Sequence, residues 1–274
     1  MSETQGEVTT AAAERDRHVG WDDMLEDVFG LNIRAGKTVW ELFSRPGRVF
    51  AAARTPDWAN GTYTPSVRVF FSIIAVILLF KFIWAGEDSA VRESFEAMVE
   101  PLREVDPRLA TPEVIARMMD RHWVVYPFAV AVCQFAAAAA VFVWGKGTPF
   151  ISRLRLYFAG IIPSTALSLP VSILLAFVPQ SLFLAVSFMT LLIVPTVDGL
   201  TVWRGLKGVH AGSGRVWRAI LFGFVTITIS LFATIVAQFA TGLSIGYETA
   251  KEFKAQAAAM INEPERTPVD ELTD

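Results

Sequence analysis

Two ionisable side chains fall inside long apolar stretches of this chain. Lys81 lies in the stretch from about 66 to 85, and Asp198 lies in the stretch from about 181 to 202. A charged group in such surroundings must find a partner, reach water or lose its charge, so each is a functional candidate. A proton or ion relay is the chemistry that a buried carboxylate would support.

The position of Asp198 leaves a structural and a functional interpretation open. Arg68 and Arg155 lie at the ends of apolar stretches, at heights compatible with that of Asp198. An ion pair that locks helix ends together is the structural interpretation, and a relay is the functional one. Lys81 lies three residues before Trp84, near the opposite end, so we expect it to extend to lipid headgroups.

The apolar stretch from about 154 to 179 combines prolines with hydroxyl groups. Pro163 and Pro170 remove backbone donors, and nearby hydroxyls can satisfy the disturbed ladder. Kinked packing is one interpretation, and a helix that lines a polar substrate cavity is the other. The hydroxyl candidates are Ser164, Thr165 and Ser168.

These residues require membrane-spanning elements to position them. Each apolar stretch has about 20 to 26 residues, which is enough for a helix to cross a hydrocarbon core of about 30 Å. Hydrophobic residues make up 53% of the 274 positions. The sequence thus predicts an all-α fold, a polytopic membrane bundle of five transmembrane helices within residues 66–246. The spans cover about 66–85, 123–144, 154–179, 181–202 and 219–244.

Basic residues predict the orientation of these spans. Residues 34–68 carry six basic and two acidic residues, whereas residues 86–122 carry five basic and nine acidic residues. Lys and Arg accumulate on the cytoplasmic side of membrane proteins. We therefore expect a cytoplasmic N-terminus and an outside C-terminus, with no cleavable signal peptide at the start of the chain.

The regions that flank the spans are amphipathic or polar. Residues 1–20 are expected to be a disordered tail, and residues 21–65 to form interfacial amphipathic helices. In that second region Trp21, Trp40, Arg45 and Arg48 are candidates for contact with lipid headgroups, although a cap packed on the helix ends fits as well.

The sequence also allows expectations for the two regions on the outer side of the membrane. Residues 86–122 are expected to hold two short amphipathic helices, the second beginning at Thr111-Pro112. Packing over the mouth of the bundle or ligand sensing would account for them. Residues 247–274 form the extracytoplasmic tail, helical at first and then disordered.

Small residues and the absence of catalytic motifs limit the functional choices. Ala129, Cys133 and Ala137 recur four apart, which allows close helix approach within the chain or between copies. The three histidines are scattered, and Cys133 is the only cysteine. We expect no enzyme activity, no metal site, no cofactor and no nucleic-acid partner.

Two short segments carry a family resemblance. One contains Thr38, Leu42-Phe43 and Arg45-Pro46-Gly47 before the first span, and the other runs from Asp198 through residues 203–210 to residues 215–219. Together they resemble the Yip family of Rab-interacting Golgi membrane proteins and its bacterial five-span relatives of unknown function. The resemblance implies a membrane adaptor, while the Ala- and Arg-rich composition favours a bacterial inner membrane.

The first functional hypothesis is therefore a Yip-like multi-pass membrane scaffold, adaptor or lipid-organising protein. Its partners would be membrane lipids, a second copy or another protein. The alternative is a small transporter or channel that uses Asp198 and the proline-containing third span.

Overall fold

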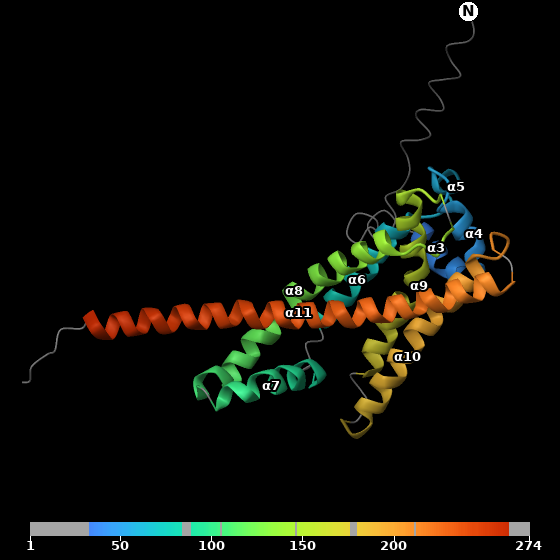
Figure 1. The fold of residues 1–274 in the computed structure, drawn as a ribbon. Coiled ribbons are helices and arrows are strands. Elements are labelled where there is room, and N and C mark those ends of the chain that lie inside the picture. Colours follow the sequence, from blue (N-terminus) through green and yellow to red (C-terminus); the bar gives the residue numbers. More distant parts are fainter. Residues whose placement is uncertain are drawn as a thin grey trace, which may run out of the picture. The chain divides into compact units, whose positions relative to one another are not determined.

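A computed structural model describes residues 33–83, 89–104, 106–145, 147–175, 180–210 and 212–262. Among these residues the regular elements are all helices, which confirms the all-α prediction. Trp21, the tail at residues 1–20 and residues 263–274 lie outside the described part of the chain. The elements are α3 (Ile33–Ser44), α4 (Pro46–Ala52), α5 (Trp58–Gly61), α6 (Ser66–Ile83), α7 (Ser89–Arg103), the 3₁₀ helix η1 (Pro107–Ala110), α8 (Pro112–Ala140), α9 (Phe150–Leu175), α10 (Gln180–Gly205) and α11 (Gly212–Asn262) (Figure 1).

Within the described residues, three helices are long and apolar enough to cross a membrane. They are Pro112–Ala140, Phe150–Val171 and Gly212–Ala255, and Ser66–Phe80 forms a shorter apolar helix. These helices indicate a membrane-embedded protein. Helix α11 has 51 residues, so it extends about 76 Å and is much longer than the predicted span at 219–244.

The chain divides into two compact units, and each is described by itself. The first contains the described residues of 33–83 and 134–229, and the second contains those of 89–133 and 230–262. Helices α8 and α11 contribute residues to both units.

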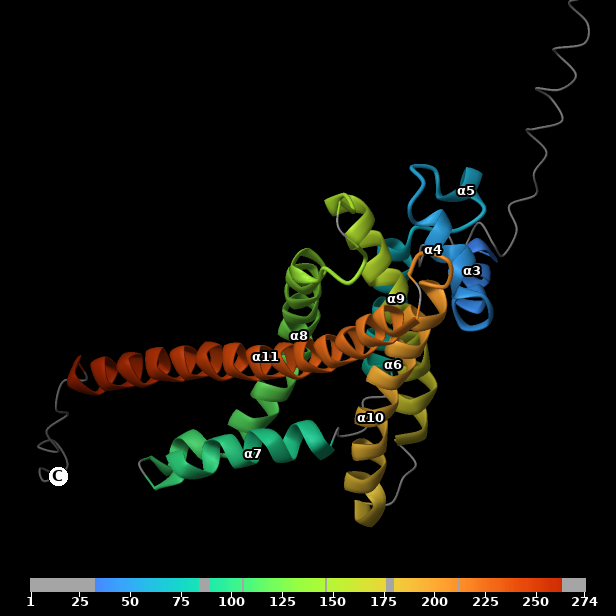
Figure 2. The ribbon, with the colours of Figure 1, turned by 45° about the vertical axis from the view of Figure 1, so that its right-hand side comes forward.

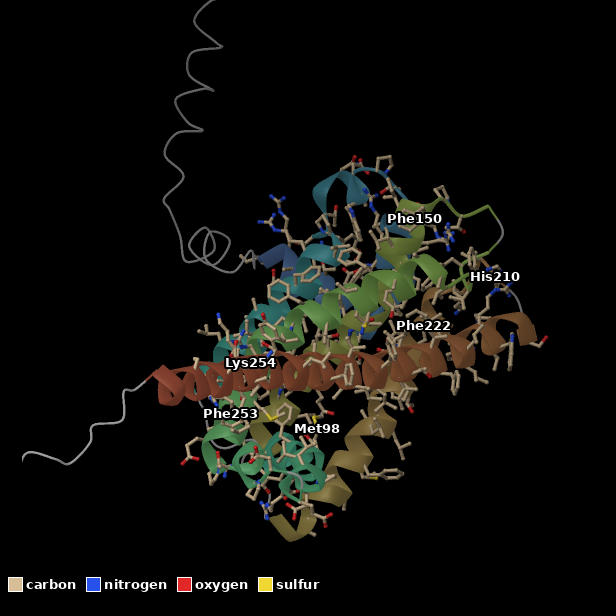
Figure 3. All side chains as sticks on the ribbon, turned by 60° about the vertical axis from the view of Figure 1, so that its left-hand side comes forward. Met98, Phe150, His210, Phe222, Phe253 and Lys254 are labelled. Carbon is tan, nitrogen blue, oxygen red and sulfur yellow. The ribbon has the colours of Figure 1, made fainter. Side chains whose placement is uncertain are left out.

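In the first unit, α9 packs against both α6 and α10, and α3 and α4 lie against the same group of helices (Figure 2). Aromatic rings fill the space between them. Phe222 of α11 lies with its ring centroid 5.5 Å from that of Tyr157 and 5.4 Å from that of Trp144 (Figure 3). All three side chains are almost completely buried, so this part of the unit is tightly packed.

Two glycines bring α10 and α11 into close backbone contact. A Cβ atom on Gly223 of α11 would stand 2.5 Å from the carbonyl oxygen of Pro195 in α10. A Cβ atom on Gly199 of α10 would stand 3.0 Å from the carbonyl oxygen of Ala219 in α11. Only glycine fits at Gly223 without a shift of the backbone. We call this contact between the two helices the α10–α11 seam.

The predicted amphipathic region before α6 is helical where it is described. Helix α3 buries Ala35, Thr38 and Leu42 and leaves Trp40 69% exposed. The Thr38 hydroxyl donates to the carbonyl of Arg34 at 2.7 Å and accepts the backbone N–H of Thr64 at 3.0 Å. Thr38 therefore ties α3 to the residues that lead into α6.

Proline accounts for the break between α3 and α4. Arg45 has φ −140° and ψ 58°, outside the helical region, because the ring of Pro46 restricts the residue before it. Helix α5 contains left-handed backbone, with φ 56° at Asn60 and 72° at Gly61. Glycine tolerates such a value without strain.

In the second unit, α7 and the start of α8 enclose an apolar cluster. Phe95 and Val99 of α7 pack with Val114, Ile115 and Met118 of α8 and with Ile245 of α11. Thr111 accepts the backbone N–H of Val114 at 3.4 Å, as expected of an N-cap. The second helix predicted in this region is not separate, because α8 continues without a break to Ala140.

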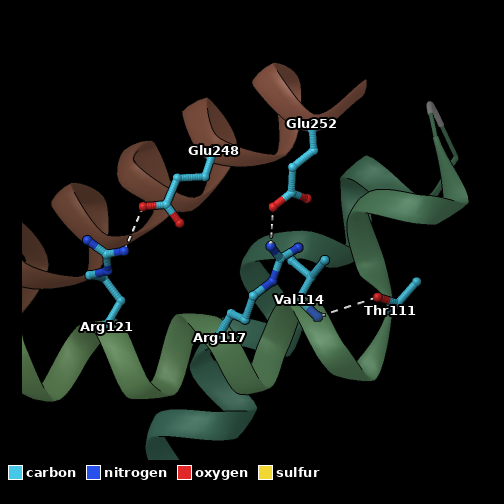
Figure 4. Close-up of polar contacts among 6 residues, drawn as sticks. All are labelled: Thr111, Val114, Arg117, Arg121, Glu248 and Glu252. Carbon is cyan, nitrogen blue, oxygen red and sulfur yellow. Dashed lines mark hydrogen bonds and ion pairs between the residues drawn. The ribbon is translucent and has the colours of Figure 1, made fainter. Parts of the chain in front are cut away.

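Two ion pairs join α8 to α11 within the second unit (Figure 4). Arg117 lies 3.0 Å from Glu252, and Arg121 lies 2.6 Å from Glu248. The partners are four residues apart on each helix, so they form successive contacts between antiparallel neighbours. All four side chains are about half exposed, and each pair contributes at most about 1 kcal/mol.

Candidate functional site

Asp198 lies on α10 in the interior of the first unit, with 1% of its surface exposed. The side chains of Ser164 on α9 and Thr226 on α11 interact with its carboxyl group. Each hydroxyl has a single proton, and each donates it to a backbone carbonyl, Ser164 to Ile161 at 2.9 Å and Thr226 to Gly223 at 3.0 Å. Oδ1 of Asp198 is accordingly buried without a hydrogen bond.

Two further polar side chains complete this interior group. Tyr157 of α9 lies close enough to feel the charge of Asp198, and its hydroxyl donates to Oε1 of Gln134 on α8 at 2.5 Å. We call Gln134, Tyr157, Ser164, Asp198 and Thr226 the buried polar cluster. It joins four helices of the first unit, and all five residues are buried.

The two arginines predicted to pair with Asp198 have other positions. The guanidinium of Arg155 donates to the carbonyl of Thr55 at 2.7 Å and lies 5.6 Å from the ring centroid of Trp58. Arg68 is exposed and lines a small pocket of about 260 Å³ with Arg34. The predicted ion pair is thus not formed, because the arginines face the segment between α4 and α6 while Asp198 faces the interior.

The proline-containing third span is one continuous helix, α9, with Pro163 and Pro170 inside it. Its candidate hydroxyls satisfy carbonyls within the helix. Thr165 donates to Ile161 at 2.8 Å, and Ser168 donates to Thr165 at 2.6 Å. Proline lacks a backbone N–H, so Pro163 and Pro170 leave the carbonyls of residues 159 and 166 without their helical donors. We expected the hydroxyls to bond to these carbonyls, but they bond to others.

The remaining sequence candidates lie outside the buried polar cluster. Lys81 lies in the last turn of α6, and its extension to headgroups stays a prediction. Ala129, Cys133 and Ala137 of α8 are buried, which agrees with a packing face within the chain. Trp40, Arg45 and Arg48 are exposed.

Arg45 and Arg48 line an open pocket of about 570 Å³ in the first unit. The pocket lies between the α3–α4 turn, the end of α10 and the start of α11. Five of its side chains are cationic and none is acidic. The lining residues are Ser44, Arg45, Pro46, Gly47, Arg48, Trp203, Arg204, Lys207 and Arg215.

Arg204 and Arg215 hold the walls of this basic pocket. One terminal nitrogen of Arg204 donates to the carbonyl of Phe43 at 2.7 Å, and the other donates to the carbonyl of Ser44. The guanidinium of Arg215 lies 4.9 Å from the ring centroid of Trp203, and its Nε is buried without a hydrogen bond. Arg204 therefore fixes the end of α3 against α10, and Arg215 places charge beside Trp203.

One acidic side chain lies near the basic pocket. Glu41 accepts a hydrogen bond of 2.7 Å from the hydroxyl of Tyr63, and Arg48 is close enough to act on the same phenol. Burial and the bond to Glu41 raise the pKa of Tyr63 to about 12. Tyr63 thus stays protonated at neutral pH and donates its hydrogen bond to Glu41, which is not among the lining residues of the pocket.

The sequence indicated only part of either group. Gln134, Tyr157 and Thr226 were not predicted, because the sequence does not show that their helices turn these side chains toward the interior. Arg204, Lys207 and Arg215 are basic residues near helix ends, which is the ordinary pattern of a cytoplasmic loop and does not by itself indicate a binding site. A cluster of cations on both sides of the α10–α11 loop, directly preceded by Trp203, was the signal available.

Comparison with known proteins adds no relative. A scan against protein-family models, a search of curated proteins and a search of solved structures each gave no match. The functional assignment therefore rests on the residues of this chain.

Proposed function

We propose that five helices cross the bilayer, with the N-terminus in the cytosol. The two further spans are α6 and α10, which have 18 and 26 residues and reach about 27 and 39 Å. The excess of Lys and Arg at residues 34–68 and 204–218 supports a cytosolic position for the ends that carry the basic pocket.

On this topology the chain is a membrane scaffold that organises lipid at the cytosolic surface, without enzymatic activity. The observation that carries the proposal is the set of tryptophans around the pocket. Trp40 is 69% exposed, Trp217 is 65% exposed and Trp203 is 37% exposed. Tryptophan favours the membrane–water interface, so these side chains mark the depth of the headgroups.

The positions of α3 and α4 support this assignment. Both helices pack on α9, and Arg204 and Thr38 tie α3 to α10 and to the residues before α6. The interfacial layer is consequently attached to the bundle, while its exposed face remains available to lipid or a partner. The similarity to Yip adaptors and a bacterial inner membrane are part of the same proposal.

A photo-crosslinking amino acid tests the interfacial layer directly. Placed at Trp40 in native membranes, it should form adducts with lipid or with a partner protein. Leu42 provides a matched control, because it lies two residues away on the same helix and is 1% exposed. No adduct at position 40, or equal adducts at both positions, would refute an interfacial scaffold.

Terminal tags test the orientation separately. A tag at residue 1 and a tag at residue 274 should be accessible from opposite sides of sealed vesicles. Access to both tags from the same side would exclude an odd number of crossings.

A transporter is a second candidate, which the buried polar cluster favours. Its specific support is the buried Oδ1 of Asp198 without a hydrogen bond, surrounded by polar groups from several helices. Intramembrane carboxylates commonly serve in proton or ion pathways. If this applies, reconstituted protein should raise proton or ion flux, Asp198→Asn should abolish the flux, and Ser168→Ala should leave it intact. Flux equal to that of empty vesicles would remove the candidate.

A further inference from the structure

We propose that the basic pocket binds the headgroup of a lipid that carries two phosphates. The site lies between the α3–α4 turn, the end of α10 and the start of α11, all within the first unit. This inference rests on the proposed function, because the pocket must lie at the membrane surface for a lipid to enter it.

Charge is the first reason for an anionic ligand. Arg45, Arg48, Arg204, Lys207 and Arg215 line the pocket, and its lining contains no acidic residue. Glu41 is nearby but does not line the pocket, and its single negative charge is smaller than the five positive charges of the lining. Five cations in one cavity repel one another unless an anion neutralises them.

The donors of the pocket differ in their freedom to bind. Both terminal nitrogens of Arg204 donate to backbone carbonyls, so Arg204 contributes charge and holds the wall. Arg45, Arg48 and Lys207 are exposed side chains, and Arg215 has a buried Nε without a hydrogen bond. Arginine and lysine groups of this kind donate to phosphate oxygens.

The surroundings favour a lipid as the source of the phosphates. Trp203 forms part of the pocket wall, and the exposed rings of Trp40 and Trp217 lie on the helices that border it. On the proposed topology this places the cations at headgroup depth, with hydrocarbon beside them. Basic pockets between helices on the cytoplasmic side are a known means of binding multiply charged lipid headgroups.

The amount of charge favours two phosphates over one. A single phosphodiester would leave four of the five cations uncompensated, whereas two phosphates leave fewer. A cavity of about 570 Å³ is also within the range of small-ligand sites. Cardiolipin has this headgroup chemistry, and phosphatidylglycerol provides a comparison with one phosphate.

The test measures lipid selectivity of the full chain in nanodiscs of neutral lipid. Cardiolipin and phosphatidylglycerol are added at equal anionic charge in physiological salt, and bound lipid is counted by native mass spectrometry. We expect the wild type to prefer cardiolipin by about tenfold. The variant R48Q/K207Q, which alters two exposed side chains, should reduce this preference to about onefold.

A matched variant separates the pocket from general attraction. R153Q/R218Q also removes two basic charges, but neither residue lines the pocket. It should bind less of both lipids and keep the wild-type preference. Equal loss of preference in the two double variants, or no preference in the wild type, would overturn the proposal.

Pyrophosphate distinguishes a lipid from a soluble ligand. It carries two phosphates and no acyl chains, so it should displace cardiolipin only weakly. Complete displacement at sub-millimolar pyrophosphate would overturn the assignment to a lipid. Lipid adducts at position 40 without cardiolipin preference would refute this inference alone, whereas the absence of those adducts would refute the scaffold function.

Discussion

The buried polar cluster and the basic pocket lie in the same unit, but their charged groups have opposite environments. The cluster places one carboxyl group among hydroxyl and amide groups, and its members are buried. The pocket gathers five cations around an open volume. The cluster is thus closed off by the protein itself, while the pocket leaves its charges accessible from outside the chain.

This difference shows that the most unusual residue of a membrane sequence need not be its binding site. Asp198 is conspicuous because it lies in an apolar stretch, and its carboxyl group is enclosed by polar side chains of the same chain. The cations at the helix ends are ordinary in a membrane protein, and only their convergence on one cavity distinguishes them. The predictions below test whether this contrast between a closed and an open region holds.

Gly223→Val should have the largest effect, since it opens the α10–α11 seam beside the buried polar cluster. The new side chain would meet the backbone carbonyl of Pro195, which cannot rotate away, so we expect a loss of about 3 kcal/mol or more. Thermal unfolding in detergent would measure it. Gly246→Val is the control, because no atom lies near a Cβ there. Equal stability of the two variants would disprove the close seam.

Arg204→Lys tests the wall of the basic pocket while keeping its charge. Lysine cannot form the fork that bonds to the carbonyls of Phe43 and Ser44, so stability should fall by about 1 to 2 kcal/mol. Greater proteolysis between α3 and α4 would report the released helix. Lys207→Arg is a control at an exposed pocket position. A wild-type cleavage pattern for Arg204→Lys would mean that the fork does not hold α3.

Tyr157→Phe should weaken the buried polar cluster by about 1 kcal/mol, because Oε1 of Gln134 loses its donor in the interior. Hydrogen–deuterium exchange of α8 and α9 would show the effect locally. The neighbouring change Phe158→Tyr cannot serve as a control for Tyr157→Phe, because it adds a polar group to an apolar contact. If the double variant Tyr157→Phe/Gln134→Leu is no more stable than the single variant, the hydrogen bond has been misassigned.

Asp198→Asn should have the smallest effect on stability, within about 1 kcal/mol of the wild type. The amide keeps the shape of the carboxyl group and removes a charge that no cation compensates, so gains and losses nearly cancel. Cardiolipin preference should be unchanged, because Asp198 does not line the pocket. A large loss of stability would show that an ionised Asp198 has a partner and would weaken the contrast between the two regions.

The sequence predicted the elements better than their junctions. The apolar stretch predicted the start of α6 at about residue 66, and the Thr111-Pro112 pair predicted the N-cap at Thr111. The sequence did not predict that α8 is unbroken or that α11 is so long. Hydropathy marks the part of a helix that faces lipid, and it carries little information on where the helix continues outside the membrane. Tertiary contacts decide that continuation, as the ion pairs between α8 and α11 illustrate.

The sites were less predictable for a related reason. Depth along a helix indicated that Arg155 and Asp198 were at similar heights, but it contained no information on which side of its helix each residue occupies. Arg155 turns to the carbonyl of Thr55, and Asp198 turns to Ser164. The basic pocket joins residues about 160 positions apart, such as Ser44 and Arg204, and no local pattern specifies that contact.

The α10–α11 seam at Gly199 and Gly223 also restricts the paths that a lipid or solute could follow through the protein. Backbones that approach this closely leave no room between α10 and α11 for an acyl tail or a file of water molecules. A solute moving toward Asp198 would therefore have to approach on a side of α10 other than the one that faces Gly223.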